Sequence, residues 1–141
     1  MKTRHPSIER LRSLTPFARC TPRELAEVDR LLTPLHAPAG TVMAAEGHHG
    51  HEFVVIETGR AQVLVRGHVV AELGTGEFFG ELSLFDHGTR TATVIALTDV
   101  EALVASHAEF EQMIDVAPSV ARGLLPAMAA RLREADRRLV G

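Results

Sequence analysis

Apolar residues recur every three or four positions between residues 21 and 32, which is the spacing of one buried helix face. Thr21, Pro22 and Glu24 stand at the start of this segment and form a capping box with proline at the first helical position. We therefore expect short N-terminal helices over about residues 7–32.

From residue 35 to about residue 105 the pattern changes to short runs rich in Val, Ile and Thr, separated by turns that contain glycine. The runs at 53–56 and 61–65 flank Thr58 and Gly59, which is typical of a β-hairpin. Many short strands at such regular spacing favour a barrel or sandwich over a sheet of parallel strands joined by helices.

Helical spacing returns after the last of these strands. Ser106 and Glu109 form a second capping box, and Pro118 suits the first turn of a long final helix. Apolar residues of that helix alternate between spacings of four and three, which defines a heptad seam. The seam consists of Ala121, Leu125, Met128, Leu132, Ala135 and Leu139. We expect two C-terminal helices over about residues 106–139.

Together these elements predict a single domain over residues 1–141, of the α+β class and mainly β. Its centre is an antiparallel β-roll over about residues 35–105, of the jelly-roll or double-stranded β-helix type. Short N-terminal helices precede the roll and two helices follow it. A chain of this length buries roughly two-thirds of its unfolded surface, so it supports a core without disulfide bonds.

Composition narrows the function classes. The net charge is −3 with histidine neutral, and the chain has no Trp or Tyr and only six Phe. These features argue against a basic or base-stacking surface for nucleic acid. No stretch approaches the roughly 20 apolar residues of a membrane span. The first twenty residues contain no apolar run of the kind found in a leader peptide, so we expect none. The single Cys20 allows no internal disulfide bond. We expect a cytoplasmic domain that binds neither nucleic acid nor membrane.

The segment 76–94 carries the candidate chemistry. The apolar residues around and after Phe79 suggest one short helical turn attached to the core, and free amides at the start of such a turn attract an anion. Gly80 allows the backbone to pass close to another group. Arg90 would complete the anion site with its planar guanidinium. Glu81 would repel a bare phosphate but accepts a hydrogen bond from a sugar hydroxyl, so a phosphate joined to a sugar fits.

Residues 79–94 resemble the phosphate-binding cassette of the cyclic-nucleotide-binding superfamily. That superfamily includes catabolite-activator-type regulators, kinase regulatory subunits and nucleotide-gated channels. The likeness rests on the order Phe-Gly-Glu-Leu-Ser-Leu followed by Arg-Thr-Ala-Thr-Val, on the separation of nine between Glu81 and Arg90, and on roll glycines at matching spacing upstream. It covers about residues 10–138 and implies a β-roll that senses cyclic AMP or cyclic GMP without being an enzyme.

The resemblance implies a role for each matching residue. Arg90 would pair with the cyclic phosphate, Glu81 would accept a hydrogen bond from the ribose 2′-hydroxyl, and Thr91 would contribute its amide and hydroxyl. Backbone amides of the neighbouring positions would face the phosphate or ribose. The implied cyclic-nucleotide-binding residues are Phe79, Gly80, Glu81, Leu82, Ser83, Arg90, Thr91 and Ala92.

The positions expected to contact the base depart from the family pattern. Thr91 stands where kinase-type cyclic AMP sites commonly have alanine, and a hydroxyl there occurs both in cyclic GMP sites and in catabolite-activator-like cyclic AMP sites. Ala135 and Asp136 fall about where those activators place base-contacting hydroxyls, and Ala135 has none. We expect Ala135 and Asp136 to form the lid over the base and cyclic AMP to be favoured over cyclic GMP.

In this family the ligand acts by moving the helices after the roll, and Pro126 suggests where. Proline inside a helix removes one hydrogen bond and clashes with the carbonyl four residues earlier, here that of Arg122, so we expect a kink. Gly123 weakens the same turn. We therefore expect residues 122–126 to act as a hinge and the segment from Ala127 onward to move.

Two charged or metal-binding patterns have simpler interpretations. His48, His49 and His51 include good zinc ligands, but neighbouring side chains of one turn rarely converge on a metal, so we expect an exposed turn and no metal. Glu134 and Asp136 interrupt the arginines of the last helix, which favours a solvated face. These arginines are Arg122, Arg131, Arg133, Arg137 and Arg138.

We therefore expect a regulatory domain with no cofactor besides its ligand. It would act through an effector protein or as one domain of a longer chain, and the heptad seam favours a homodimer through the last helix. Three alternatives stay open: the sensor half of a longer transcription regulator or enzyme, a degenerate interaction module that binds no nucleotide, and a cupin-type metalloprotein that uses the histidines.

Overall fold

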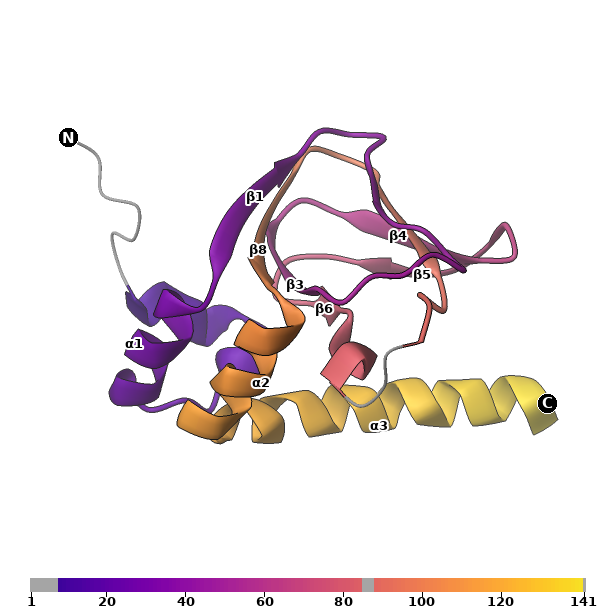
Figure 1. Ribbon diagram of the computed structural model, residues 1–141. Coiled ribbons are helices and arrows are strands. Elements are labelled where there is room, and N and C mark those ends of the chain that lie inside the picture. The colour runs from indigo at the N-terminus through magenta and orange to yellow at the C-terminus, as the bar shows by residue number, and fades with distance from the viewer. Residues whose placement is uncertain (1–7, 85–87, 141) are drawn as a thin grey trace.

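The computed structural model describes residues 8–84 and 88–140 and confirms the expected antiparallel β-roll. Two four-stranded sheets enclose one apolar interior, to which strands of both sheets contribute. The N-terminal helices and the first C-terminal helix lie at one end of the roll, and the long last helix runs beneath it (Figure 1).

The strands and helices have the following bounds. The first sheet contains, in spatial order, β1 (Thr33–Ala37), β8 (Val100–Ala105), β3 (Phe53–Thr58) and β6 (Phe78–Phe79). The second contains β2 (Val42–Ala44), β7 (Thr93–Ala96), β4 (Ala61–Val65) and β5 (His68–Leu73). The helices are η1 (Ile8–Ser13), η2 (Thr15–Phe17), α1 (Pro22–Arg30), η3 (Glu81–Leu84), α2 (His107–Val116) and α3 (Ser119–Val140), where η marks a 3-10 helix. Across the described ranges, no helix is both long and apolar enough to cross a membrane.

The central strand β3 is apolar on both faces. Phe53 and Val55 pack with the helices outside the roll, whereas Val54 and Ile56 pack inside it. This division follows from the alternation of side chains along a strand, and it explains why four consecutive residues are apolar. Phe53 stacks on Phe110 of α2, with 4.2 Å between the ring centroids. The helices therefore cover the outer face of the sheet that carries β3.

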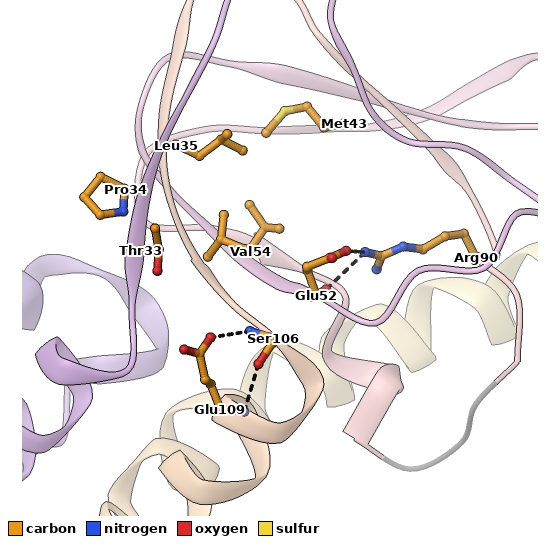
Figure 2. Close-up of a pocket in the computed structure, with 10 residues that line it drawn as sticks. Thr33, Pro34, Leu35, Met43, Glu52, Val54, Arg90, Ser106 and Glu109 are labelled. Atoms are coloured by element: carbon orange, nitrogen blue, oxygen red, sulfur yellow. Dashed lines mark hydrogen bonds and ion pairs between the residues drawn. The ribbon is translucent and has the colours of Figure 1, made fainter.

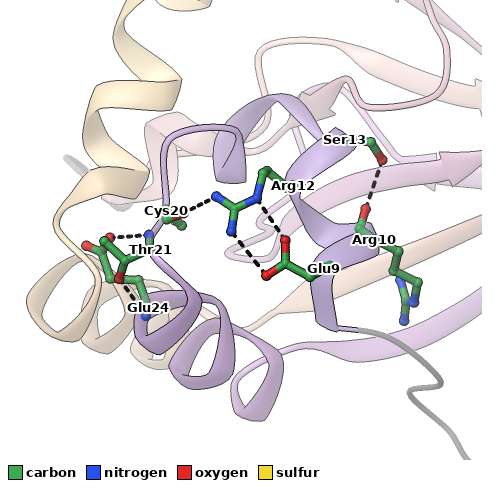
Figure 3. Close-up of polar contacts among 7 residues, drawn as sticks. All are labelled: Glu9, Arg10, Arg12, Ser13, Cys20, Thr21 and Glu24. Carbon is green, nitrogen blue, oxygen red and sulfur yellow. Dashed lines mark hydrogen bonds and ion pairs between the residues drawn. The ribbon is translucent and has the colours of Figure 1, made fainter.

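Both expected capping boxes are present. The Glu24 amide donates to the Thr21 hydroxyl oxygen at 3.1 Å, and the Thr21 amide donates to the Glu24 carboxylate at 2.8 Å (Figure 3). Ser106 and Glu109 repeat this arrangement at α2. The second Glu24 oxygen accepts from the Ser119 amide at 3.0 Å. Burial opposes ionisation of Glu24, but the hydrogen bonds from Thr21 and Ser119 outweigh it and lower its pKa. One carboxylate therefore joins the starts of α1 and α3.

The short helices expected at the N-terminus are present, and the first two of them, η1 and η2, are 3-10 helices. So short a segment forms few α-helical hydrogen bonds, and 3-10 turns are common in such pieces. The start of these helices, expected at about residue 7, lies outside the described residues. Arg12 ties η1 to the next turn, because its guanidinium donates to Glu9 at 3.0 Å and to the backbone carbonyl of Cys20 (Figure 3).

The last helix, α3, runs unbroken through Pro126. Gly123 serves close packing: a Cβ at this position would lie 2.5 Å from the backbone carbonyl oxygen of Pro16 in η2. Val120 and Leu124 on the same part of α3 are buried. The first turns of α3 are therefore anchored to η2, and Ala127 and Met128 pack against the same apolar core. The hinge expected over residues 122–126 stays a prediction.

Candidate functional site

The predicted cassette lies between β6 and β7. The expected short helical turn is present as η3, directly after β6, while residues 85–87 lie outside the described part. The backbone of Arg90 is fixed by the turn that precedes β3. Its amide donates to the carbonyl of His48 at 2.8 Å, and its carbonyl accepts from the amide of Gly47 at 2.9 Å. These two hydrogen bonds fix the backbone position from which the Arg90 side chain extends into the candidate site.

The Arg90 side chain is largely but not fully buried, with 11% of it exposed. Its Nη2 donates to the backbone carbonyl of Glu52 at 3.1 Å and lies 3.4 Å from Oε1 of the Glu52 carboxylate (Figure 2). Burial lowers the pKa of Arg90, and the charges of Glu52 and Glu81 partly offset that shift. A guanidinium has five N–H donors, so these two contacts leave donors for an anion.

Two glycines make room for this guanidinium. A Cβ on Gly50 would overlap Nε of Arg90. A Cβ on Gly80 would overlap the carbonyl oxygen of Glu52 and lie 2.9 Å from Nη1 of Arg90, and the φ of Gly80 is +88°. The prediction that Gly80 permits a close backbone approach is confirmed. Phe79 forms a further wall, because its ring centroid lies 5.8 Å from the Arg90 guanidinium.

Glu81, the predicted ribose acceptor, is bound by the last helix. Nη1 of Arg131 donates to the Glu81 carboxylate at 3.0 Å, and Nη2 donates to the backbone carbonyl of Phe78 at 2.6 Å. The Arg131 guanidinium also lies over the Phe78 ring, 4.4 Å from its centroid. The Glu81 side chain is only 11% exposed and that of Arg131 is 37% exposed, so the carboxylate end of this ion pair is shielded from water.

The solvated face expected for the α3 arginines is therefore wrong at Arg131. The side chain follows the buried face of the helix, three residues after Met128 and seven after Leu124, and this spacing was a usable signal in the sequence. Arg138, seven residues later still, donates to the backbone carbonyl of Val70 in β5 at 3.1 Å. Two arginines thus hold the second half of α3 against the roll.

Glu81 and Arg90 line different cavities. Arg90 and Glu52 belong to a cavity of about 400 Å³ (Figure 2). Glu81 lies at a smaller crevice of about 170 Å³, between η3 and the C-terminal helices. Apart from Glu81, the crevice is lined by apolar side chains: Phe110, Ile114, Ala121, Leu124, Leu125 and Met128.

The other predicted site residues occupy less enclosed positions. Leu82 is 47% exposed, Thr91 is exposed and Ala92 is half-buried. The side chain of Ser83 lies outside the described part of the chain. The expected lid residues, Ala135 and Asp136, are exposed on α3. Their roles toward a nucleotide stay predictions.

The histidine turn contacts the start of α2. The rings of His49 and His51 are 6.3 Å apart, and the ring of His51 is 6.2 Å from that of His107. His51 is thus half-buried, whereas His48 and His49 are exposed as expected. Among the described residues, no three His, Cys, Asp or Glu side chains are grouped so as to hold a metal ion.

Known proteins share this fold and this sequence pattern. The family model of the cyclic nucleotide-binding domain matches residues 34–116. The chain is 36% identical over 105 residues to the cyclic AMP receptor protein of Thermus thermophilus, a match that covers 70% of this chain and 48% of that protein. It is 29% identical over 128 residues to the CRP-like cAMP-activated global transcriptional regulator of Mycobacterium tuberculosis, covering 87% and 57%.

A solved structure has the same fold as this chain. The catabolite activator protein of Thermus thermophilus matches with a TM-score of 0.80 and 31% identity, over 89% of this chain and 61% of that one. The fold and the cassette define a β-roll sensor domain of the regulatory type. The chain belongs to the cyclic nucleotide-binding domain family. It spans about half the length of the two curated relatives named above.

Proposed function

We propose that this chain binds a cyclic nucleotide, with cyclic AMP favoured over cyclic GMP, and acts as a non-enzymatic cytoplasmic sensor. The observation that carries the proposal is the environment of Arg90. Its buried guanidinium sits between Gly50 and Gly80 and is held by a neutral carbonyl and one long carboxylate contact. A cyclic phosphate would supply the short, charge-assisted hydrogen bonds that Glu52 does not.

The ribose role proposed for Glu81 couples ligand binding to α3. A 2′-hydroxyl that donates to Glu81 meets a carboxylate already bound by Arg131. The ribose must share or displace that contact, and either outcome changes how α3 lies on the roll. Because Arg131 is seven residues from Arg138, a shift at the first contact is transmitted to the second, at Val70. The ligand signal therefore leaves through the second half of α3.

The preference for cyclic AMP rests on the relatives and on the lid. The two relatives reported above are named as a cyclic AMP receptor protein and a cAMP-activated global transcriptional regulator. Ala135 offers no side-chain hydrogen bond to a base, so base selectivity would depend on Thr91 and Asp136.

The sensor would pass its signal to a second copy of the chain, to a further domain or to an effector protein. Leu125 and Leu132, seven residues apart on α3, are 62% and 65% exposed. An exposed apolar pair at heptad spacing supports homodimerisation through α3. The relatives are about twice as long, which supports a role as the sensor part of a longer regulator, or one completed by a separate effector protein.

Calorimetric titration with cyclic AMP, cyclic GMP and linear 5′-AMP tests the proposal. We expect saturable binding of both cyclic nucleotides, tighter for cyclic AMP, and much weaker binding of 5′-AMP. No heat of binding with either cyclic nucleotide at millimolar concentration would refute nucleotide sensing by this chain.

A further inference from the structure

The cavity beside Arg90 is lined by different residues from the crevice at Glu81. Its walls come from β1, β2, β3, β8 and the first turn of α2 (Figure 2). Among the described residues, its lining includes none from β4, β5, β6, η3 or α3. Arg90 lines this cavity and Glu81 does not, so the guanidinium is reachable from a cavity that Glu81 does not share.

One wall of this cavity is apolar and incompletely covered. Leu35 of β1 lies opposite Ala102 of β8 in the antiparallel register, and Ala102 belongs to the interior of the roll. Leu35 therefore faces inward, yet 44% of it is exposed. Val54 and Met43 continue the same wall. Apolar surface that lines a cavity favours an apolar ligand, because its burial removes that surface from water.

The polar groups select the charge of the ligand. Ser106 and Glu109 hold each other in the cap of α2, where one Glu109 oxygen accepts from the Ser106 amide at 2.8 Å. Among the described lining residues, Arg90 carries the one positive charge. Glu52 is 57% exposed and only 3.4 Å from Arg90, which makes it a weak and displaceable partner. A carboxylate that enters from this side can replace the Glu52 carboxylate at the buried guanidinium and bind it in bidentate fashion.

We infer that this cavity is a second ligand site, for a small amphipathic carboxylate of the medium-chain fatty acid type. The carboxylate binds Arg90, and the alkyl chain lies against Leu35, Met43, Val54 and Val104. A cavity of about 400 Å³ is at the lower end of the size range of small-molecule pockets, which suits a chain of this length.

Sharing Arg90 makes the second site regulatory. This consequence rests on the proposed nucleotide function, since it requires the cyclic phosphate to use the same guanidinium. A bound carboxylate then weakens nucleotide binding, and the nucleotide weakens carboxylate binding by the same factor.

Titration of the whole chain with decanoate, below its micellar concentration and without nucleotide, tests the site. Calorimetry and the methyl NMR signals of Met43, Val54 and Val104 report binding. We expect saturable binding, with decan-1-ol at least about tenfold weaker because it carries no charge for Arg90. Absence of saturable decanoate binding, or equal binding of decanol, would overturn the inference.

Matched variants locate the site. Leu35→Asp places a charge on the apolar wall, whereas Leu97→Asp makes the same change at a similarly exposed residue, 39% exposed, away from the cavity. We expect Leu35→Asp to lose at least about tenfold in decanoate affinity and Leu97→Asp to bind like the parent. Glu52→Gln changes an exposed side chain and removes the competing charge, so this variant should bind decanoate more tightly. Equal affinities for the parent, Leu35→Asp and Glu52→Gln would contradict the site.

The two proposals fail separately. Decanoate binding in a chain that ignores cyclic AMP would leave the second site standing and remove the nucleotide function. Cyclic AMP binding in a chain that ignores decanoate would do the reverse. If both bind, cyclic AMP must raise the apparent Kd of decanoate, and independent binding would refute the shared use of Arg90.

Discussion

Arg131 of α3 donates a hydrogen bond of 3.0 Å to the carboxylate of Glu81 in η3. The carboxylate that we expect to bind the ribose is therefore already bound to the last helix. The two residues are 50 positions apart in the chain. Because Glu81 is almost buried, loss of its partner would leave a carboxylate with reduced access to water. This contact joins the candidate ligand site to the element that would carry its signal.

Replacing Arg131 should therefore loosen the second half of α3. In Arg131→Ala we expect faster amide hydrogen exchange over residues 127–138 without ligand, and a loss of about 1–3 kcal/mol in stability. Arg137→Ala is the control, because Arg137 is 72% exposed and pairs only with Glu134 of its own helix among the contacts described. Equal exchange in both variants would show that Arg131 does not hold the helix.

Glu52 should restrain nucleotide binding, because its carboxylate competes for Arg90. Glu52→Gln keeps the backbone carbonyl contact and removes the competing charge. We expect calorimetry to show roughly two- to fivefold tighter cyclic AMP binding, the range of an exposed ion pair. Glu72→Gln, which breaks the surface pair with Arg60, should leave the affinity unchanged. Weaker binding in Glu52→Gln would instead make Glu52 part of the ligand site.

Gly80 should tolerate no side chain, for two separable reasons. Its φ is +88°, and a Cβ would overlap the Glu52 carbonyl. Gly67 has a φ of +79° but has open space around it. Gly67→Ala therefore measures the backbone cost alone, and we expect Gly80→Ala to lose about 1–3 kcal/mol more in thermal unfolding. Equal losses would mean that the close approach beside Arg90 is not rigid.

Pro126 should set the point from which α3 responds to ligand. Since the helix is anchored up to Leu124, we expect cyclic AMP to raise amide protection mainly in the cassette and in residues 127–138. Pro126→Ala restores a hydrogen bond and should reduce this ligand-dependent difference. Pro118→Ala, which lies just before α3, should not. A helix equally protected with and without ligand would make Pro126 a purely structural feature.

The sequence was informative where the signal is local. Capping boxes, glycine turns and apolar runs predicted the strands and helices of the roll, because each depends on residues close together in the chain. The hairpin expected between residues 53–56 and 61–65 was wrong, because β3 and β4 belong to different sheets and do not pair with each other. The cassette was recognisable for the same reason, since Gly80, Glu81 and Arg90 lie within eleven positions.

The contacts that complete the candidate site carry no such signal. Glu52 meets Arg90 across 38 positions, and Arg138 meets β5 across 68. Pairing of this kind depends on the path of the folded chain, which no local pattern specifies. Arg131 is the partial exception, because its spacing from Leu124 and Met128 placed it on the buried face of α3.

The central claim is that Arg90 binds the cyclic phosphate, and calorimetry of Arg90→Ala beside Arg60→Ala tests it most directly. Arg60 is a surface residue, paired with Glu72 and 56% exposed, so its loss controls for a change of net charge. With both variants folded by their thermal midpoints, we expect Arg60→Ala to bind cyclic AMP like the parent. Arg90→Ala should bind roughly thirtyfold more weakly or worse, since loss of one partner of a desolvated charge pair costs about 2–5 kcal/mol. Parent-like affinity in Arg90→Ala would contradict the assignment of the site.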